Sequence, residues 1–132
     1  MLMAGADGVV AKTSSRPVAD TVARLVDLLG SKGVKVFAVI DQQAEARAVG
    51  LDLRETTLVI FGNPKAGTGV MAASPLAALD LPLKVLVWAE PGGATSVIYT
   101  APATLAARYG LTPETAAALE VVDGLTDALV AD

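Results

Sequence analysis

The sequence from Gly62 to Gly69 contains residue types that can bind a small anion. It follows an apolar stretch that we expect to form a strand, and it reads Gly62-Asn63-Pro64-Lys65-Ala66-Gly67-Thr68-Gly69. Where a strand, a glycine-rich turn and a helix start follow one another, backbone N–H groups and the helix dipole can bind phosphate. Asn63, Lys65 and Thr68 add an amide, a charge and a hydroxyl. We therefore predict a long polar loop that can hold a small carboxylate or phosphate.

This segment does not match the known nucleotide-binding patterns. Gly62 and Gly67 have the spacing of a P-loop, but Thr68 stands in the place of the lysine and Gly69 in the place of the hydroxyl residue. The segment also lacks the third glycine of the dinucleotide-binding pattern. These mismatches exclude hydrolysis of nucleoside triphosphates. The same residue types are typical of an ordinary turn, which is the simpler interpretation, and anion binding is the alternative.

Asp41 and Asp80 are two further candidate site residues. Asp41 ends a predicted strand, and Asp80 precedes Leu81-Pro82, where a predicted helical pattern breaks. If the fold brought the two carboxylates together, they could act as an acid/base pair or bind a hard cation. Aspartate is also a common cap of helices and turns, and we favour this structural role.

The composition excludes several kinds of chemistry. The 132 residues include no cysteine and no histidine, so the usual zinc, haem and non-haem iron ligands are missing, as are thiolate and Ser–His nucleophiles. A general acid or base would have to be a carboxylate, a lysine, a tyrosine or a bound water. We predict neither a cofactor nor a metal ion. Ten basic residues, scattered among fourteen acidic ones, argue against binding to nucleic acid.

The length and the hydrophobic content predict one folded domain. Hydrophobic residues make up 53% of the chain and charged residues 18%, which is ample for a single core over residues 1–132, with residues 1–7 as a flexible N-terminus. No export signal is visible, and no apolar run approaches the ~20 residues that span a bilayer. We expect a cytoplasmic protein that does not interact with membranes.

The spacing of apolar residues predicts about five strands and two long helices, with shorter helices between them. Strands are expected at residues 8–13, 34–41, 56–61, 83–89 and 95–100, and the last two form a hairpin. A first helix is expected from residue 18 to a stop at Gly30 or Gly33. Further helices are expected at residues 42–49, 70–79 with a break at Pro75, 101–109 and 113–130, the last with Thr112 as N-cap. The pattern predicts an α+β fold, a mainly antiparallel or mixed sheet with helices on one face. Because such a sheet leaves edges and one face open, we expect a homodimer.

Two groups of apolar residues are candidates for packing or binding. Trp88 and Tyr99 lie on the two hairpin strands, and we expect them to pack across the strands, with a pocket or an interface as the alternative. The C-terminal helix carries apolar residues at helical spacing that predict core or dimer packing rather than a membrane-surface helix: Ala116, Leu119, Val122 and Leu125.

Three segments resemble the family catalogued as domain of unknown function 302 (DUF302): residues 36–41, 58–65 and 80–88. The specific part is Phe61-Gly62-Asn63-Pro64-Lys65 followed by Asp80-Leu81-Pro82, and the resemblance runs from Lys12 to about Leu129. It implies a β-α-β(4)-α arrangement and association as dimers, but no established activity. Members often carry a histidine directly after the aspartate equivalent to Asp41. Here that position is Gln42, which puts any role of that imidazole in doubt.

These observations leave two main hypotheses. The first is a dimeric domain without enzymatic activity that binds a small anionic or apolar molecule, or another protein, near residues 63–65. The second is a small carboxylate-dependent enzyme that uses Asp41, Asp80 and Lys65. Nucleic-acid binding is a third class, and the acidic net charge of −4 argues against it.

Overall fold

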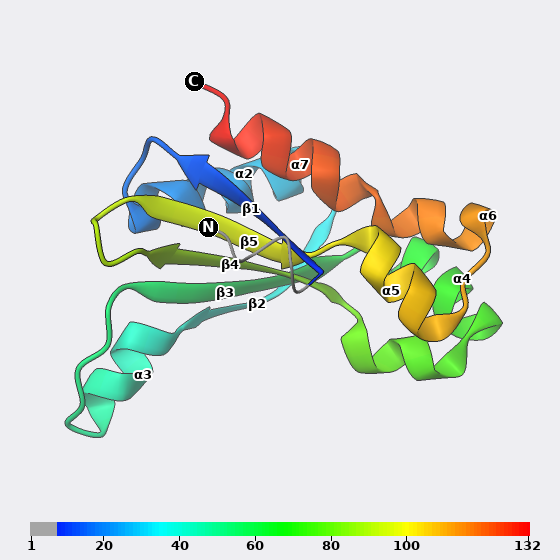
Figure 1. Ribbon diagram of the computed structural model, residues 1–132, viewed down its shortest axis with the longest axis horizontal. Coiled ribbons are helices and arrows are strands. Elements are labelled where there is room, and N and C mark those ends of the chain that lie inside the picture. Colours follow the sequence, from blue (N-terminus) through cyan, green and yellow to red (C-terminus); the bar gives the residue numbers. More distant parts are fainter. Residues whose placement is uncertain (1–7) are drawn as a thin grey trace.

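Five strands form one antiparallel sheet in this computed structural model, which describes residues 8–132 (Figure 1). The strands are Val9–Ser14 (β1), Lys35–Asp41 (β2), Thr56–Gly62 (β3), Leu83–Ala89 (β4) and Thr95–Thr100 (β5). Their order in the sheet is β1-β5-β4-β3-β2. The predicted α+β fold and the β4–β5 hairpin are confirmed. The prediction of a flexible N-terminus concerns residues 1–7, which lie outside the described residues.

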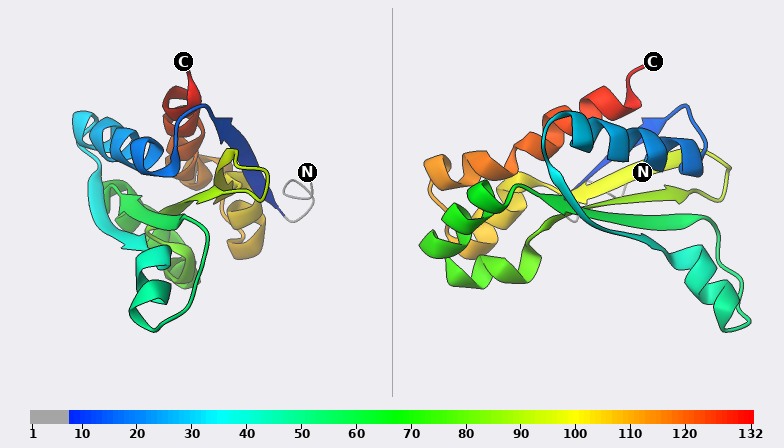
Figure 2. Two further views of the ribbon diagram at one scale, coloured as in Figure 1. Left: turned by 90° about the vertical axis from the view of Figure 1, so that its left-hand side faces the viewer. Right: turned by 180° about the vertical axis from the view of Figure 1, so that it is seen from behind.

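The helices form a second layer and two end groups. They are Val18–Ser31 (α2), Gln42–Ala48 (α3), Pro64–Ala73 (α4), Pro102–Tyr109 (α5), Pro113–Ala116 (α6) and Val121–Val130 (α7), with the 3-10 helices Pro75–Asp80 (η1) and Ala117–Leu119 (η2). Helices α2 and α7 lie side by side on one face of the sheet (Figures 1 and 2). Helices α4, η1, α5 and α6 gather at one end of the sheet, whereas α3 extends from the opposite end.

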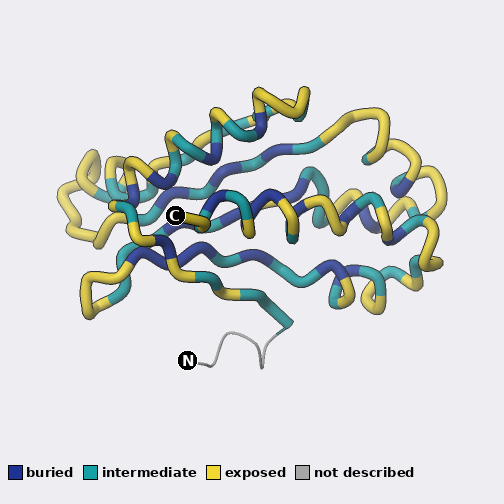
Figure 3. The backbone as a smooth tube through the Cα atoms, turned by 90° about the horizontal axis from the view of Figure 1, so that it is seen from above, coloured by how far each residue is buried: buried dark blue, intermediate teal, exposed yellow. Residues whose placement is uncertain are grey.

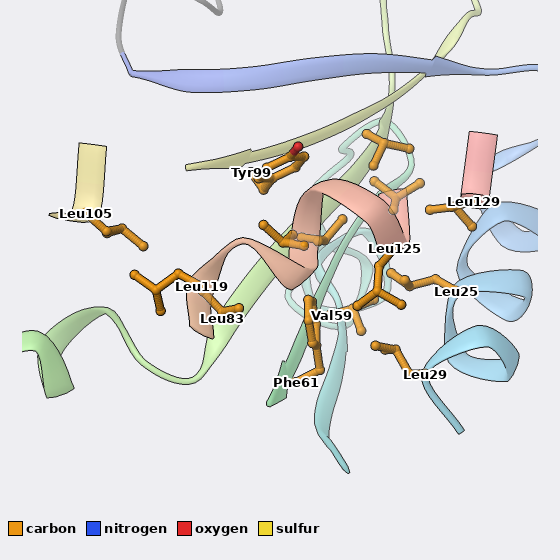
Figure 4. Packing of buried hydrophobic residues seen from close by; sticks show 14 of the residues in the cluster. Leu25, Leu29, Val59, Phe61, Leu83, Tyr99, Leu105, Leu119, Leu125 and Leu129 are labelled. Atoms are coloured by element: carbon orange, nitrogen blue, oxygen red, sulfur yellow. The ribbon is translucent and has the colours of Figure 1, made fainter. Parts of the chain in front are cut away.

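The core lies between the sheet and helices α2 and α7. In α2 the buried residues recur every three or four positions, as in an amphipathic helix, whereas buried and half-buried residues alternate along β3 (Figure 3). The central side chains are fully shielded from water, among them Leu25, Leu29, Phe61 and Leu125 (Figure 4). Burial of each such side chain contributes about 1.5–3 kcal/mol, so this apolar layer is the main source of stability.

The predicted loop at residues 62–69 is wrong, because α4 begins at Pro64. The side chain of Asn63 accepts hydrogen bonds from the backbone N–H groups of Lys65 and Ala66 at 3.0 and 3.4 Å, so Asn63 is the N-cap. Proline fits the first helical position, and each interior glycine costs only about 1 kcal/mol relative to alanine. The helix therefore begins at the Asn63 cap and includes the two glycines.

Two other expectations need correction. The last helix is not continuous from 113 to 130 but is divided into α6, η2 and α7. Its start is confirmed, because the Thr112 hydroxyl accepts a hydrogen bond from Thr115 N at 3.2 Å. Trp88 and Tyr99 do not pack against each other: Trp88 pairs with Ser96, so Trp88 and Tyr99 point to opposite faces of the sheet.

Two arginines, one within α2 and one just before it, bind the C-terminal end of α7. Arg24 donates through Nε to the carbonyl oxygen of Leu129 at 3.2 Å and through Nη2 to that of Ala128 at 3.2 Å. Arg16 donates to Leu129 O at 3.2 Å and to Ala131 O at 3.3 Å. The last carbonyl groups of a helix have no partner within the helix, so these guanidinium groups fix α7 onto α2.

We expect Arg24→Ala to lower the free energy of unfolding by about 1–2 kcal/mol, because two carbonyl groups lose charged donors. Arg24→Lys is the matched control: it keeps the charge but not the two-pronged donor geometry, and should recover only part of the loss. Urea denaturation followed by circular dichroism measures both changes. An Arg24→Ala protein as stable as the wild type would show that water replaces the arginine fully.

Candidate functional site

Asp80 is the centre of a polar cluster at the end of the sheet. Its Oδ2 accepts hydrogen bonds from Arg108 Nη1 at 2.8 Å and from the Tyr109 hydroxyl. Both donors lie in the last turn of α5, while Asp80 ends η1. The Asp80 side chain is 34% exposed, so the cluster is reached by solvent. A guanidinium and a phenol thus both donate to one carboxylate in this cluster.

The cluster shifts the acidity of its members. The hydrogen bond from Tyr109, aided by Arg108, lowers the pKa of Asp80 below its ordinary value of 3.8 and outweighs the opposing effect of burial. The same hydrogen bond raises the pKa of the Tyr109 hydroxyl. Asp80 is therefore a carboxylate and Tyr109 a neutral phenol at neutral pH. This protonation state suits binding better than proton transfer.

A small cavity of about 50 Å³ adjoins Asp80. It is lined by residues from η1, β4, β5, α5 and α7: Asp80, Leu83, Lys84, Tyr99, Thr100, Leu105 and Val122. We call this cavity the Asp80 cleft. A water needs roughly 10–15 Å³ on this measure, so the cleft holds a few waters or a ligand of a few non-hydrogen atoms. Its wall is part apolar and part polar.

Tyr99 links the Asp80 cleft to a second polar cluster beneath α7. Its side chain is almost fully buried, and its hydroxyl donates to Asp123 Oδ1 at 2.5 Å. Lys12 lies beside it, with Nζ 5.2 Å from the ring centre, 2.8 Å from Asp127 Oδ1 and 2.6 Å from Thr126 Oγ1. These bonds join β1, β5 and α7.

The protonation states in this second cluster follow from burial and pairing. Burial, together with the hydrogen bond to Asp123, raises the pKa of Tyr99. Burial alone would lower the pKa of Lys12, but the hydrogen bonds to Asp127 and Tyr99 outweigh it, so its pKa is raised. Tyr99, which lines the cleft, is thus neutral, and Lys12 beside it is charged.

The other predicted site residues have local roles. Asp41 caps α3 by accepting from Ala44 N at 2.9 Å, and Gln42 is the first residue of that helix. Thr68 donates to Pro64 O at 2.6 Å within α4, and Lys65 is exposed on the same helix. Together with the cap at Asn63, these contacts account for the backbone path without a ligand.

Asp41 and Asp80 are not brought together. Asp41 pairs with Thr57 at one end of β3, whereas Asp80 precedes Leu83, which pairs with Phe61 at the other end. The four residue steps from Thr57 to Phe61 span roughly 13 Å in a strand. The two carboxylates therefore cannot share a proton or a cation. Within residues 8–132, no group of three or more acidic side chains is placed to hold a metal ion.

Sequence reasoning missed Asp80's partners. Arg108 and Tyr109 lie 28 and 29 positions after Asp80, and no spacing rule connects a 3-10 helix to the end of a later helix. Lys12 and Asp123 are even further apart in the sequence. The one available signal was Asp80 itself, a charged residue directly before Leu81-Pro82.

A five-stranded antiparallel sheet with helices on one face places the chain among small two-layer α+β proteins. The model of the family described as "Domain of unknown function DUF302" matches residues 10–131, and the chain belongs to this family. The predicted resemblance is confirmed. The crystal structure of an uncharacterized conserved DUF302 protein from Bacillus stearothermophilus has the same fold, with a TM-score of 0.78 at 20% identity over 93% of this chain and 95% of that chain.

Two relatives from Brucella carry a functional name. The fluoride-specific ion channel FluC 1 of Brucella suis biovar 1 (strain 1330) is 38% identical over 104 residues, which is 79% of this chain and 41% of the relative. FluC 1 of Brucella abortus biovar 1 (strain 9-941) is also 38% identical over 104 residues and is covered to 38%. The chain thus spans about two fifths of the length of these relatives. In residues 8–132, every helix is too short or too polar to cross a membrane.

The shifted acidity of Asp80 predicts how stability changes with pH. Because the pKa of Asp80 is lowered in the folded state, the carboxylate stabilises the fold above its unfolded pKa of about 3.8 and loses this effect as the pH falls through the folded pKa. Asp80→Asn should therefore be less stable than the wild type at pH 7, and the difference should shrink below about pH 4. Tyr109→Phe, which removes the main cause of the shift, should behave in the same way but more weakly. Urea midpoints between pH 2.5 and 7 measure this, and a constant difference across that range contradicts it.

Proposed function

We propose that this chain is a homodimeric domain without enzymatic activity that binds a small polar molecule in the Asp80 cleft. The observation that carries the proposal is the fixed Asp80–Tyr109–Arg108 cluster beside a cavity of about 50 Å³. Groups that are already held in place lose little entropy when a ligand binds. The cytoplasmic location and the homodimer stay predictions from the sequence.

The cleft offers both donors and an acceptor to a ligand. Lys84 supplies an ammonium group, and Thr100 supplies a hydroxyl. The hydrogen bonds to Asp80 from Arg108 and Tyr109 both end on Oδ2, so Oδ1 can accept a bond from a ligand. A ligand that fits carries an anionic oxygen and an N–H or O–H group on a few non-hydrogen atoms. Small amino acids and hydroxy acids have this chemistry.

The enzyme that uses Asp41, Asp80 and Lys65 is the weaker alternative. Asp41 lies at the opposite end of the sheet from Asp80, so the three groups do not share a substrate-sized site. Asp80 is moreover an ionised carboxylate with a lowered pKa, whereas a general acid or base at neutral pH requires a pKa near 7.

The Brucella relatives support a second candidate function. They are named as fluoride-specific ion channels, and this chain matches about two fifths of their length. We propose on this basis that the domain can act as an accessory module of an anion channel, with the Asp80 cleft as a sensor of a small anion. Fluoride then belongs among the ligands to be tested, because Lys84 and the hydroxyl of Thr100 are donors that suit a small anion.

Ligand binding can be tested by NMR titration with glycine, lactate, acetate, formate and sodium fluoride. We expect at least one of these probes to shift the backbone amide signals of residues around the cleft. Lys84→Ala should weaken that binding about tenfold or more, because it removes the cation that faces the anion. Lys65→Ala is the matched control on α4 and should leave the affinity unchanged. Full binding by Lys84→Ala, or no shift with any probe, contradicts the proposal.

A further inference from the structure

The face of the sheet that points away from α2 and α7 carries a continuous apolar row. One residue from each strand contributes to it, in register across all five strands: Ala11, Ile98, Leu86, Leu58 and Ile40. The last four are only half-buried, and Ala11 is exposed. We call this surface the open face. Helices α2 and α7 shield the opposite face (Figure 2).

The neighbouring rows of the open face are also poor in charge. On one side of the apolar row lie Trp88, Thr56 and Ser96, and on the other lie Ile60, Ala38 and Lys84. Among these residues only Lys84 is charged. An apolar centre with a polar margin is the usual anatomy of a protein interface, and a water-facing sheet would carry more polar residues in its central row.

Trp88 makes this face suited to an interface. The Arg54 guanidinium lies 6.0 Å from the centre of the Trp88 ring and donates to Ala89 O at 3.1 Å, which holds it at the margin. Tryptophan and arginine are the residues that most often contribute large binding energies at interfaces. The indole Nε1 is shielded from water and has no acceptor among the described residues.

The open face has the area of a dimer interface. Five strands spaced ~4.8 Å apart, with three rows of side chains spaced ~6.7 Å apart along each strand, cover roughly 500 Å² per copy, or about 1,000 Å² for two copies. A specific interface needs about that much. The segment after α3 adds exposed apolar side chains at the end of the sheet, because Val49, Leu51 and Leu53 are 71%, 64% and 44% exposed.

We propose that the open face is the surface through which two copies of this chain associate, face to face about a two-fold axis that runs along the apolar row. This inference names the surface of the proposed homodimer and therefore depends on it. Such an axis places Leu86 on Leu86 of the second copy and Leu58 on Leu58. With this axis, Lys84 of one copy lies opposite Trp88 of the other copy. A two-fold axis along β4 would instead place the two Lys84 side chains opposite each other.

The test combines sedimentation velocity with the fluorescence of Trp88, the only tryptophan in the chain. The wild type should sediment as a dimer, and its emission should shift to longer wavelength on dilution, as the half-buried Trp88 loses the cover of the second copy. Leu86→Arg should raise the dimer dissociation constant by roughly 100-fold or more, because it buries an unpaired charge. Ala11→Arg, on an exposed edge position of the same row, should act in the same direction without disturbing the core.

Val121→Arg is the matched control, since Val121 is 45% exposed on the helix layer. It should remain a dimer with wild-type emission. A dimeric Ala11→Arg protein, with Trp88 emission unchanged on dilution, would show that the copies associate through another surface. A wild type that stays monomeric at all concentrations would contradict the proposed homodimer, and with it the role of the open face as its interface.

Discussion

The packing of α2 and α7 against one face of the sheet is the constraint on which the other features depend. Leu25 and Leu29 of α2 and Leu125 and Leu129 of α7 are almost completely buried over the sheet. Because strand residues alternate between faces, this packing fixes which half of each strand is interior. It places Val59, Phe61, Val85 and Val97 inside, and it leaves Leu58, Leu86 and Ile98 on the other side.

The polar clusters occur where this apolar packing ends. Tyr99 is the last inward-facing residue of β5, and its hydroxyl reaches Asp123 at the start of α7. Asp80 lies three residues before the start of β4, where η1 and α5 pack together at the end of the layer. A buried hydroxyl or carboxylate requires a partner, so the edges of the core are where the chain positions polar side chains precisely. The Asp80 cleft is a result of this arrangement.

Much of the fold could be predicted from the sequence, because it depends on local signals. The β4–β5 hairpin follows from alternating residues around a turn rich in glycine and proline, and α2 follows from its apolar spacing. The start of α4 at Pro64 was not predicted, because the glycines and the proline of residues 62–69 are equally typical of a loop. The opposite directions of Trp88 and Tyr99 depend on the hairpin register, which composition does not define.

The candidate site was less predictable than the fold. Asp80 was identified as a candidate, but Arg108 and Tyr109 approach it only because η1 and α5 pack together. The separation of Asp41 from Asp80 likewise follows from strand order. Local sequence can indicate which residues are able to do chemistry. The contacts among residues distant in sequence decide which of them meet.

The pairing of β1 with β5 has a consequence for biosynthesis. Val9 lies opposite Thr100, and α2 is fixed to the final turn of α7 through Arg24. Strand β1 thus finds its partner strand, and α2 its partner helix, only in the last third of the chain, so these contacts are non-local and form slowly. During translation, the part of α2 that packs on α7 stays exposed until residues near 130 have left the ribosome, and in that interval the nascent chain is a natural client for a chaperone.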